Sequence, residues 1–154
     1  WPDEINPGKK SDSAVHHFDI FPTIAKAAGI ESIHTLDGVD LLPFIKNEKQ
    51  TKPHKTLFWR SGNHQSVLHE KWKYIISKKE NFRWLFDTSV DPLESNNLIE
   101  SHPEVARKIE ELMTKFNSEQ NDPLFPASYE VPIMIDKYDG QKFEEGDEYL
   151  YWSN

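Results

Sequence analysis

Four short apolar runs in the middle of the chain are separated by polar clusters, which is the pattern of a strand meander. The runs, rich in Trp, Phe, Tyr, Ile and Val, cover residues 56–60, 65–69, 72–77 and 82–87. Their short connections suit antiparallel neighbours, because a parallel pair needs a much longer crossover. Every second residue of the last two runs is large and apolar, which predicts one aromatic, packed face of the sheet. These residues are Trp72, Tyr74, Ile76, Phe82, Trp84 and Phe86.

A helix from Ser101 to about Asn117 is predicted after the meander. Ser101 and Glu104 have the spacing of a capping box, and Pro103 falls in the first turn, where its missing N–H is tolerated. An apolar stripe recurs at helical spacing along this segment. The stripe comprises Val105, Ile109, Leu112, Met113 and Phe116. We expect it to cover one face of the four strands.

A shorter helix is predicted near the start of the chain. Asp19 is its candidate N-cap, Pro22 lies in its first turn, and Gly29 suits the left-handed conformation that ends helices. The apolar residues at helical spacing are Ile20, Ile24, Ala27 and Ala28. We therefore expect this helix to lie against a larger body. Asp37-Gly38 predicts a turn, with apolar residues just after it.

The remaining segments are predicted to be loops and a C-terminal extension. Residues 1–16 and 46–55 are polar and contain Pro, which indicates a surface loop and a linker. Towards the end of the chain, an alternating apolar run at 131–135 precedes an acidic run at 144–148 and an aromatic stretch at 149–152. An aromatic terminus of this density is expected to dock on the body of the protein.

Composition narrows the class of protein. The chain of 154 residues is long enough for one domain with a core. Its net charge of −8 argues against a general affinity for nucleic acid or anionic membranes, and no apolar run approaches the roughly 20 residues of a membrane helix. Without cysteine, it forms no disulfide and no thiolate metal site. The chain starts at Trp1 without a Met, from which we expect a fragment of a longer protein.

Two groups of motifs resemble the distal part of the formylglycine-dependent sulfatases. The first group, at residues 19–23, 28–29 and 37–43, follows that family's order Asp-x-x-Pro-Thr, Ala-Gly and Asp-Gly-x-x-Leu-x-Pro. The second group, at 85–87, 91–94 and 97–98, is similar to its Leu-Tyr-Asp, Asp-Pro-x-Glu and Asn-Leu. The chain therefore looks like the C-terminal part of an arylsulfatase-like enzyme of the alkaline phosphatase superfamily.

The resemblance implies an α+β fold. The C-terminal subdomain of such an α/β sulfatase has a four-stranded antiparallel sheet packed by one long helix, and a helix of the main domain precedes it. The implied divisions are the end of the main domain (1–50), the subdomain (51–122) and an extension packed on the body (123–154).

The resemblance also implies the activity of the full-length parent. Sulfatases of this family hydrolyse sulfate esters with a formylglycine, made from Cys or Ser in a Cys/Ser-x-Pro-x-Arg motif, and hold the sulfate with calcium. Those groups lie upstream, so we assign no catalytic or metal-binding residue to this chain. Ser101 and Pro103 have the motif's separation, but Val105 stands where Arg is required. The implied partners are the N-terminal catalytic part and a sulfated carbohydrate, in a periplasmic or secreted location.

Substrate contact is the role that remains for this chain. By resemblance, loops of the C-terminal subdomain help wall the substrate pocket, and the loop between the first two strands has side chains suited to sugar hydroxyls and an anionic group. The candidate substrate-binding residues are Arg60, Asn63, His64 and Gln65. The alternative is a solvated hairpin without a ligand. The chain departs from the family pattern nearby, because Leu68 replaces an Arg and Glu70 replaces a turn Gly.

Two other functions stay open on the sequence. A phosphodiesterase or phosphonate hydrolase of the same superfamily shares much of this architecture, and its ester chemistry would be decided upstream. A non-catalytic carbohydrate-binding domain is the alternative from another class, because residues 51–86 contain six more basic than acidic residues and many aromatic ones. The histidines show no spacing typical of a metal site.

Overall fold

The computed structural model describes the chain except for residues 32–33, 79–80, 123, 125–129, 135–148 and 154. It contains two compact units, residues 1–57 and 58–154. The boundaries predicted at residues 50 and 122 stay a prediction. None of the helices in the described part of the chain is long and apolar enough to cross a membrane.

The first unit is built from short helices joined by loops. The 3-10 helix η1 (His17–Asp19) runs directly into α1 (Ile20–Ala27), and a one-turn helix α2 (Leu42–Ile45) follows the Asp37-Gly38 turn. α1 ends near Gly29 as predicted, where a φ of +71° gives the expected left-handed conformation. The sequence pattern did not predict α2, because so short a helix shows no period.

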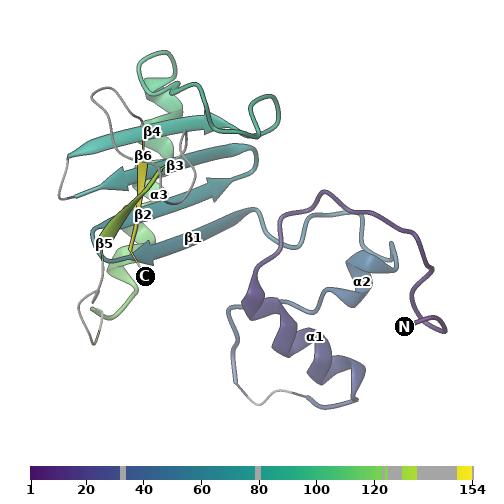
Figure 1. Cartoon of the computed structure of the whole chain (residues 1–154). Coiled ribbons are helices and arrows are strands. Elements are labelled where there is room, and N and C mark those ends of the chain that lie inside the picture. The colour runs from purple at the N-terminus through teal and green to yellow at the C-terminus, as the bar shows by residue number, and fades with distance from the viewer. Residues whose placement is uncertain (32–33, 79–80, 123, 125–129, 135–148, 154) are drawn as a thin grey trace. The chain divides into compact units, whose positions relative to one another are not determined.

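The predicted antiparallel sheet follows, with strand order β1-β2-β3-β4 (Figure 1). The strands are β1 (Thr56–Ser61), β2 (His64–His69), β3 (Trp72–Ser77) and β4 (Phe82–Asp87). β2 and β4 both pair antiparallel with β3, which places Tyr74 between Val67 and Leu85. The strand meander predicted from the sequence is therefore confirmed, with each boundary within a residue or so.

One long helix closes the core. α3 (Pro103–Ser118) lies across one face of the sheet, as predicted (Figure 1). Its inward residues pack on side chains from β2, β3 and β4. The buried cluster consists of Val67, Tyr74, Leu85, Ala106, Ile109 and Met113. This core belongs entirely to the second unit.

The prediction of a single aromatic face was wrong. Directly opposite residues of an antiparallel pair point to the same face of a sheet. Tyr74 lies opposite Leu85 on the α3 face, whereas Ile75 lies opposite Trp84 on the other face. Phe82 and Phe86 each lie two positions from Trp84 along β4, so they share its face and also point away from α3. Alternation shows the period of each strand, but it does not show the register between strands.

The capping box predicted for α3 was also wrong. His102, rather than Ser101, occupies the N-cap position, and its side chain makes no capping hydrogen bond. Ser101 Oγ instead donates to the Leu98 carbonyl at 3.1 Å. Because the hydroxyl is used in the turn before the helix, it does not reach the first helical N–H groups.

A two-stranded ribbon completes the described part of the second unit. β5 (Glu130–Met134) pairs antiparallel with β6 (Tyr149–Ser153). Figure 1 shows this ribbon crossing the sheet on the face away from α3. The predicted alternation thus corresponds to a strand, while Ile135 and the acidic run at 144–148 lie outside the described residues.

Candidate functional site

A buried carboxylate organises the first unit. Asp19 is fully buried and accepts hydrogen bonds from the backbone N–H groups of His16 at 2.7 Å and Val39 at 2.9 Å. Both of its carboxylate oxygens lie 2.9 Å from Nε2 of His54. One side chain therefore joins three segments: the turn before α1, the loop after it and the segment that precedes β1.

Asp19 does not cap α1 through its side chain, which corrects the sequence prediction. It occupies the N-cap position, but its φ of −75° and ψ of −17° are helical because η1 runs straight into α1. Its carboxylate instead completes a capping box on η1 with His16. The predicted N-cap position is therefore confirmed, but the side-chain cap is absent because a helical turn already precedes this residue.

Two further motif residues complete the same arrangement. Thr23 Oγ1 donates to the Asp19 carbonyl at 2.6 Å and accepts from the Leu41 N–H at 3.0 Å. A Cβ at Gly38 would lie 2.2 Å from the Phe18 carbonyl oxygen, so this close approach requires glycine. We name the group the Asp19 clasp. It consists of Asp19, Thr23, Gly38, Val39 and His54.

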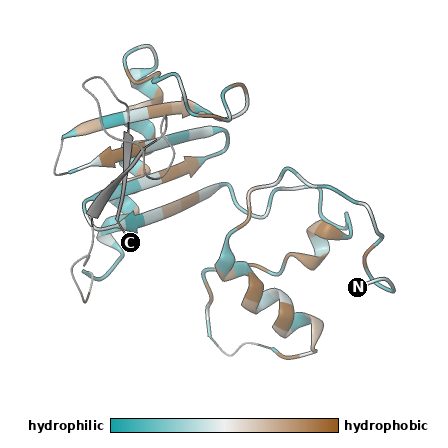
Figure 2. Cartoon of the chain, in the orientation of Figure 1, coloured by the Kyte–Doolittle hydropathy of each residue, from teal (hydrophilic) through white to brown (hydrophobic). Residues whose placement is uncertain are grey.

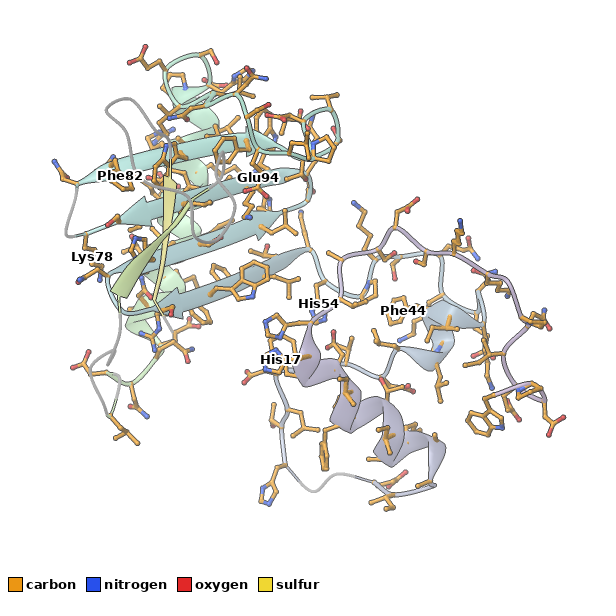
Figure 3. All side chains as sticks on the ribbon, in the orientation of Figure 1. His17, Phe44, His54, Lys78, Phe82 and Glu94 are labelled. Atoms are coloured by element: carbon orange, nitrogen blue, oxygen red, sulfur yellow. The ribbon has the colours of Figure 1, made fainter. Side chains whose placement is uncertain are left out.

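Histidine rings surround the Asp19 clasp. The ring centroids of His16 and His17 are 4.2 Å apart, and the His54 ring meets Phe18 edge-on at 5.7 Å. Figure 3 shows His17 and His54 close together at the start of α1. Burial and the neighbouring His17 lower the pKa of His16. Burial opposes ionisation of Asp19, but two backbone N–H groups and His54 outweigh it and lower the pKa of this carboxyl.

The Asp19 clasp is suited to holding the fold rather than to chemistry. The carboxylate of Asp19 is closed to solvent and engaged by three donor groups, so it is not placed to take a proton from a substrate. Among the residues that the structure describes, no group of three or more His, Cys, Asp or Glu side chains could hold a metal ion. The residues of the first motif group in the clasp therefore have a structural role, because they hold the segments around α1 together.

The second motif group fixes the chain beyond β4. Asn97 Nδ2 donates to the Arg83 carbonyl at 3.1 Å, and its Oδ1 accepts from the Leu85 N–H at 3.0 Å. The Asn97 side chain therefore pairs with the edge of β4 much as a neighbouring strand would. Glu94 binds Lys73 Nζ through both carboxylate oxygens, at 2.7 and 2.8 Å. These contacts tie the loop between β4 and α3 to the sheet.

The predicted substrate-binding residues all lie at the β1–β2 hairpin, but they do not share one surface. Buried Gln65 accepts from Asn117 Nδ2 of α3 at 2.8 Å, so it points to the α3 face. His64, also buried, precedes it in β2 and points to the opposite face. Arg60 is exposed and donates to the backbone carbonyl of Asn121, just after α3, at 3.0 Å. Asn63 is half-buried in the turn. Their binding of substrate stays a prediction.

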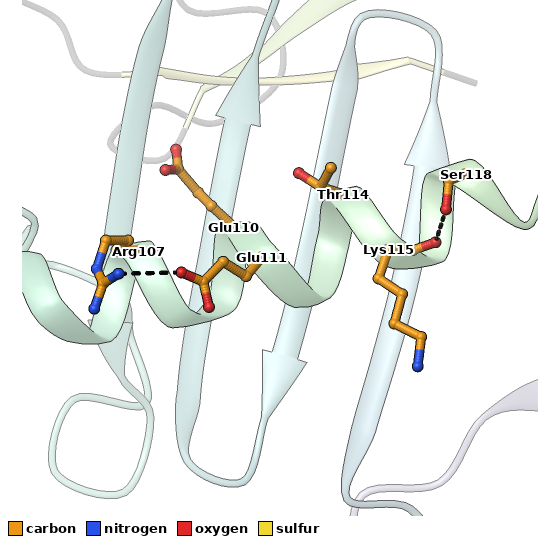
Figure 4. Close-up of a pocket in the computed structure, with 6 residues that line it drawn as sticks. All are labelled: Arg107, Glu110, Glu111, Thr114, Lys115 and Ser118. Atoms are coloured by element: carbon orange, nitrogen blue, oxygen red, sulfur yellow. Dashed lines mark hydrogen bonds and ion pairs between the residues drawn. The ribbon is translucent and has the colours of Figure 1, made fainter.

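A groove of about 480 Å³ runs along α3 (Figure 4). It is lined by Arg107, Glu110, Glu111, Thr114, Lys115 and Ser118. Arg107 pairs with Glu111 at 3.2 Å, and Glu110 is held by Arg83 at 2.8 Å and by the Tyr74 hydroxyl. Burial and Glu110 raise the pKa of Tyr74, which keeps its hydroxyl protonated as a donor. These charges are paired with one another, so the groove is a weak candidate for catalysis.

Sequence reasoning missed two contacts that define these sites. His54 is 35 positions from Asp19, and Asn117 is 52 positions from Gln65. Local periodicity carries no information about pairs at such separations. The useful signal for the Asp19 clasp was the Asp-Gly turn, because a glycine there indicates either a turn or a close backbone approach.

Comparisons with known proteins converge on sulfatases. Residues 1–122 match the family described as N-sulphoglucosamine sulphohydrolase, C-terminal. The chain is 30% identical over 104 residues to steryl-sulfatase of Homo sapiens, covering 66% of this chain and 18% of that protein. It is 24% identical over 179 residues to the ulvan-active sulfatase of Formosa agariphila, covering 89% of this chain and 35% of that protein.

A solved structure shares the fold. A protein in complex with its substrate D-glucosamine-2-N,6-O-disulfate superimposes with a TM-score of 0.60 and 25% identity, over 78% of this chain and 26% of that one. The chain thus spans between a sixth and about a third of the length of these relatives. Because the family match covers residues 1–122 of 154, this chain belongs to the N-sulphoglucosamine sulphohydrolase C-terminal family of sulfatases.

Proposed function

We propose that the full-length parent of this chain hydrolyses sulfate esters, and that the chain is its C-terminal portion. The observation that carries the proposal is the family match over residues 1–122, because it includes both motif groups. The matched curated relatives are named sulfatases. In this proposal the chain contributes structural support and part of the substrate pocket.

The catalytic groups are proposed to lie in the rest of the parent. By resemblance to the family, the nucleophile is a formylglycine and calcium holds the sulfate. The described residues do not fit these roles, because Asp19 is buried and fully engaged and the chain contains no cysteine. Ser101, which has a proline at the motif spacing, binds the Leu98 carbonyl and is followed by Val105 instead of Arg. The chain's own contribution is therefore positional.

The exposed face of α1 supports a contact with the N-terminal catalytic part of the same protein. Ile20, Phe21 and Ile24 are 57%, 62% and 62% exposed, whereas Ala25 is buried. Figure 2 shows hydrophobic residues along this helix. A helix of eight residues depends on packing of its apolar face for stability. The larger body predicted from the sequence to cover this helix is proposed to be the catalytic part.

A sulfated carbohydrate is the proposed substrate class. One matched protein is named for activity on ulvan, and the solved structure holds a disulfated D-glucosamine. Exposed Arg60 and half-buried Asn63 present charge and hydrogen-bonding groups, which suit a sulfated sugar better than an apolar alcohol. A steryl sulfate is the contrasting substrate, because the human relative is a steryl-sulfatase.

Turnover by the parent tests the proposed activity. We expect the purified parent to release inorganic sulfate from sulfated oligosaccharides faster than from a steryl sulfate, and to release little phosphate from matched phosphate esters. Peptide mass spectrometry of the segment upstream of Trp1 should show a formylglycine in a Cys/Ser-x-Pro-x-Arg motif. Faster release of phosphate would favour the phosphodiesterase alternative. Sulfate release by residues 1–154 alone would refute the upstream placement of the chemistry.

Substitution at the β1–β2 hairpin tests the pocket wall. Arg60→Ala in the parent is expected to lower kcat/KM by about tenfold, because an exposed guanidinium that contacts a sulfate or carboxylate contributes a charge-assisted hydrogen bond. Arg107→Ala on α3 is the matched control and should leave kcat/KM unchanged. Equal kinetics for the two variants would remove Arg60 from the substrate site. The same comparison with His64→Ala tests the buried end of the hairpin.

A further inference from the structure

Two histidine rings lie at the beginning of the helical run that η1 and α1 form. His16 is the N-cap of η1, and His17 is its first residue. Their ring centroids are 4.2 Å apart, and the His16 ring stacks on Phe18 at 4.0 Å. His16 is half-buried, whereas His17 is exposed. Histidine is the side chain whose ordinary titration falls near neutral pH, so this pair is a candidate pH-sensitive element.

The His16 ring caps η1 only while Nδ1 carries no proton. This nitrogen accepts from the Phe18 N–H at 3.4 Å, a long hydrogen bond that the stacking of the two rings holds in place. A proton on Nδ1 turns the acceptor into a donor and sets it against that N–H. The other half of the cap is the Asp19 carboxylate, which accepts from the His16 N–H at 2.7 Å. Protonation of the ring therefore removes one of the two capping hydrogen bonds.

Charge also disfavours a cation on the His16 ring. The free N–H groups at the beginning of a helix carry a partial positive charge, and η1 runs directly into the eight residues of α1. The His17 ring, when protonated, places a second positive charge 4.2 Å away. Burial, His17 and His54 together outweigh Asp19, so the pKa of His16 lies below its ordinary value.

The titratable groups that face His16 come from two elements. His17 and Asp19 belong to η1 itself, and His54 reaches them from the segment before β1. Among the described residues that act on the His16 ring, Asp19 is the one acid. Both of its carboxylate oxygens lie 2.9 Å from Nε2 of His54. This single carboxylate is therefore already engaged by one imidazole and does not balance charge on all three.

We propose that His16 is a pH-sensitive cap, which closes η1 near neutral pH and opens it when the ring takes up a proton. The folded state binds fewer protons at His16 than the unfolded chain does. The contribution of the cap is therefore present above the unfolded pKa of about 6.5 and is lost as the pH falls through the folded value. Because Asp19 binds the backbone N–H groups of both His16 and Val39, we expect the opening to reach the Asp19 clasp.

Hydrogen exchange in the full-length parent tests the pH-sensitive cap. The readout is the protection factor of the Phe18 amide between about pH 7.5 and about pH 5, resolved by fragmentation in mass spectrometry. We expect it to fall about fivefold with acidification, which is the effect of losing one helix cap. His16→Asn keeps a capping acceptor that does not titrate, so its protection factor should stay constant. His34→Asn changes an exposed histidine of the same unit and is the matched control, which should show the full fall.

Three results would overturn the proposal. A constant protection factor in the unsubstituted parent would show that protonation does not open η1. An equal fall in His16→Asn would assign the titration to His17 or His54. If the variants fail to fold, deuterium exchange at the imidazole carbon of His16 measures its titration in the unsubstituted parent, and a midpoint equal to that in urea would overturn the cap. None of these measurements uses sulfate release, so they stand or fall separately from the proposed function.

Discussion

The two units of the chain bury their apolar residues to different extents. In residues 58–154, Tyr74, Leu85 and Ile109 are fully buried between the sheet and α3. In residues 1–57, Ile24 and Phe21 of α1 are more than half exposed, and the described polar contacts centre on buried Asp19. The second unit thus has a core of its own, while the first has a polar joint and an apolar face in water. This difference supports the proposal that the exposed face of α1 packs on the catalytic part of the parent.

The largest expected effect is a cavity in the core of the second unit. Ile109→Ala should lower the free energy of unfolding by about 3 kcal/mol, because it removes a fully buried side chain through which α3 packs on the sheet. Urea unfolding of the chain, followed by tryptophan fluorescence, measures the change. Ile24→Ala on exposed α1 is the matched control and should stay within about 0.5 kcal/mol of the unsubstituted chain. Equal losses for the two variants would remove the contrast between the units.

The next effect is expected in the Asp19 clasp. Asp19→Asn replaces one carboxylate oxygen by an amide NH₂ group. This new donor then faces the backbone N–H groups or the His54 ring that donate to Asp19, so a hydrogen bond is lost. A loss of about 2 kcal/mol in local stability is expected from the unsatisfied buried groups. Hydrogen exchange at the Val39 amide measures it. Asp37→Asn, in the exposed turn of the same segment, is the control. Unchanged Val39 exchange in the Asp19 variant would show that the carboxylate is not the joint.

The Asp19 carboxylate also predicts that the first unit loses stability at low pH. The pKa of Asp19 is lower in the folded chain than its ordinary value, so the folded state binds fewer protons in this range. Its stabilisation is complete above the unfolded pKa of about 4 and is lost as the pH falls through the folded value. The protection factor of the Val39 amide, which is the unstructured exchange rate divided by the observed rate at the same pH, should therefore fall below about pH 4, and the Asp19→Asn variant should lack this step. An identical acid step in both would assign it to another group.

The sequence predicted elements better than it predicted contacts between them. The strands and α3 appeared from short-range signals, such as the β-rich run at 72–77 and the stripe that includes Ile109. The register that separates Tyr74 from Trp84 on opposite faces depends on pairing between strands, which no single run encodes. The pairing of His54 with Asp19 was likewise invisible, because it closes a loop of 35 residues. The candidate substrate residues were adjacent in sequence, yet the pleat separates His64 from Gln65.

A smaller effect is expected where the sheet meets α3. Tyr74→Phe removes a hydroxyl that donates to Glu110 from a buried ring and should cost about 1 kcal/mol in the free energy of unfolding. Burial and Glu110 raise the pKa of Tyr74, so its contribution is present below the unfolded pKa of about 10 and is lost as the pH rises further. Urea unfolding at neutral and at alkaline pH should therefore show a gap between the two proteins that narrows with pH. A constant gap would mean that the loss comes from packing alone.

The smallest expected effect is at the β2–β3 turn, where Glu70 stands in place of the turn glycine of the sulfatase pattern. Its φ of +59° lies in the left-handed region, which strains residues with a Cβ. Glu70→Gly should raise the free energy of unfolding by about 0.5 kcal/mol, because relief of this strain exceeds the extra entropy of glycine in the unfolded chain. Urea midpoints measured on matched preparations resolve a change of this size when the slope is unchanged.

The alanine variant separates the backbone effect from the loss of the Glu70 side chain. Glu70→Ala removes the carboxylate but keeps the Cβ, so it should not gain the stability expected of Glu70→Gly. Glu70→Asn should fall between the two, because asparagine tolerates the left-handed region better than most residues. Equal midpoints for the glycine and alanine variants would assign the effect to the lost carboxylate. A gain confined to glycine would instead show that Glu70 makes the β2–β3 turn less stable than the glycine of the sulfatase pattern would.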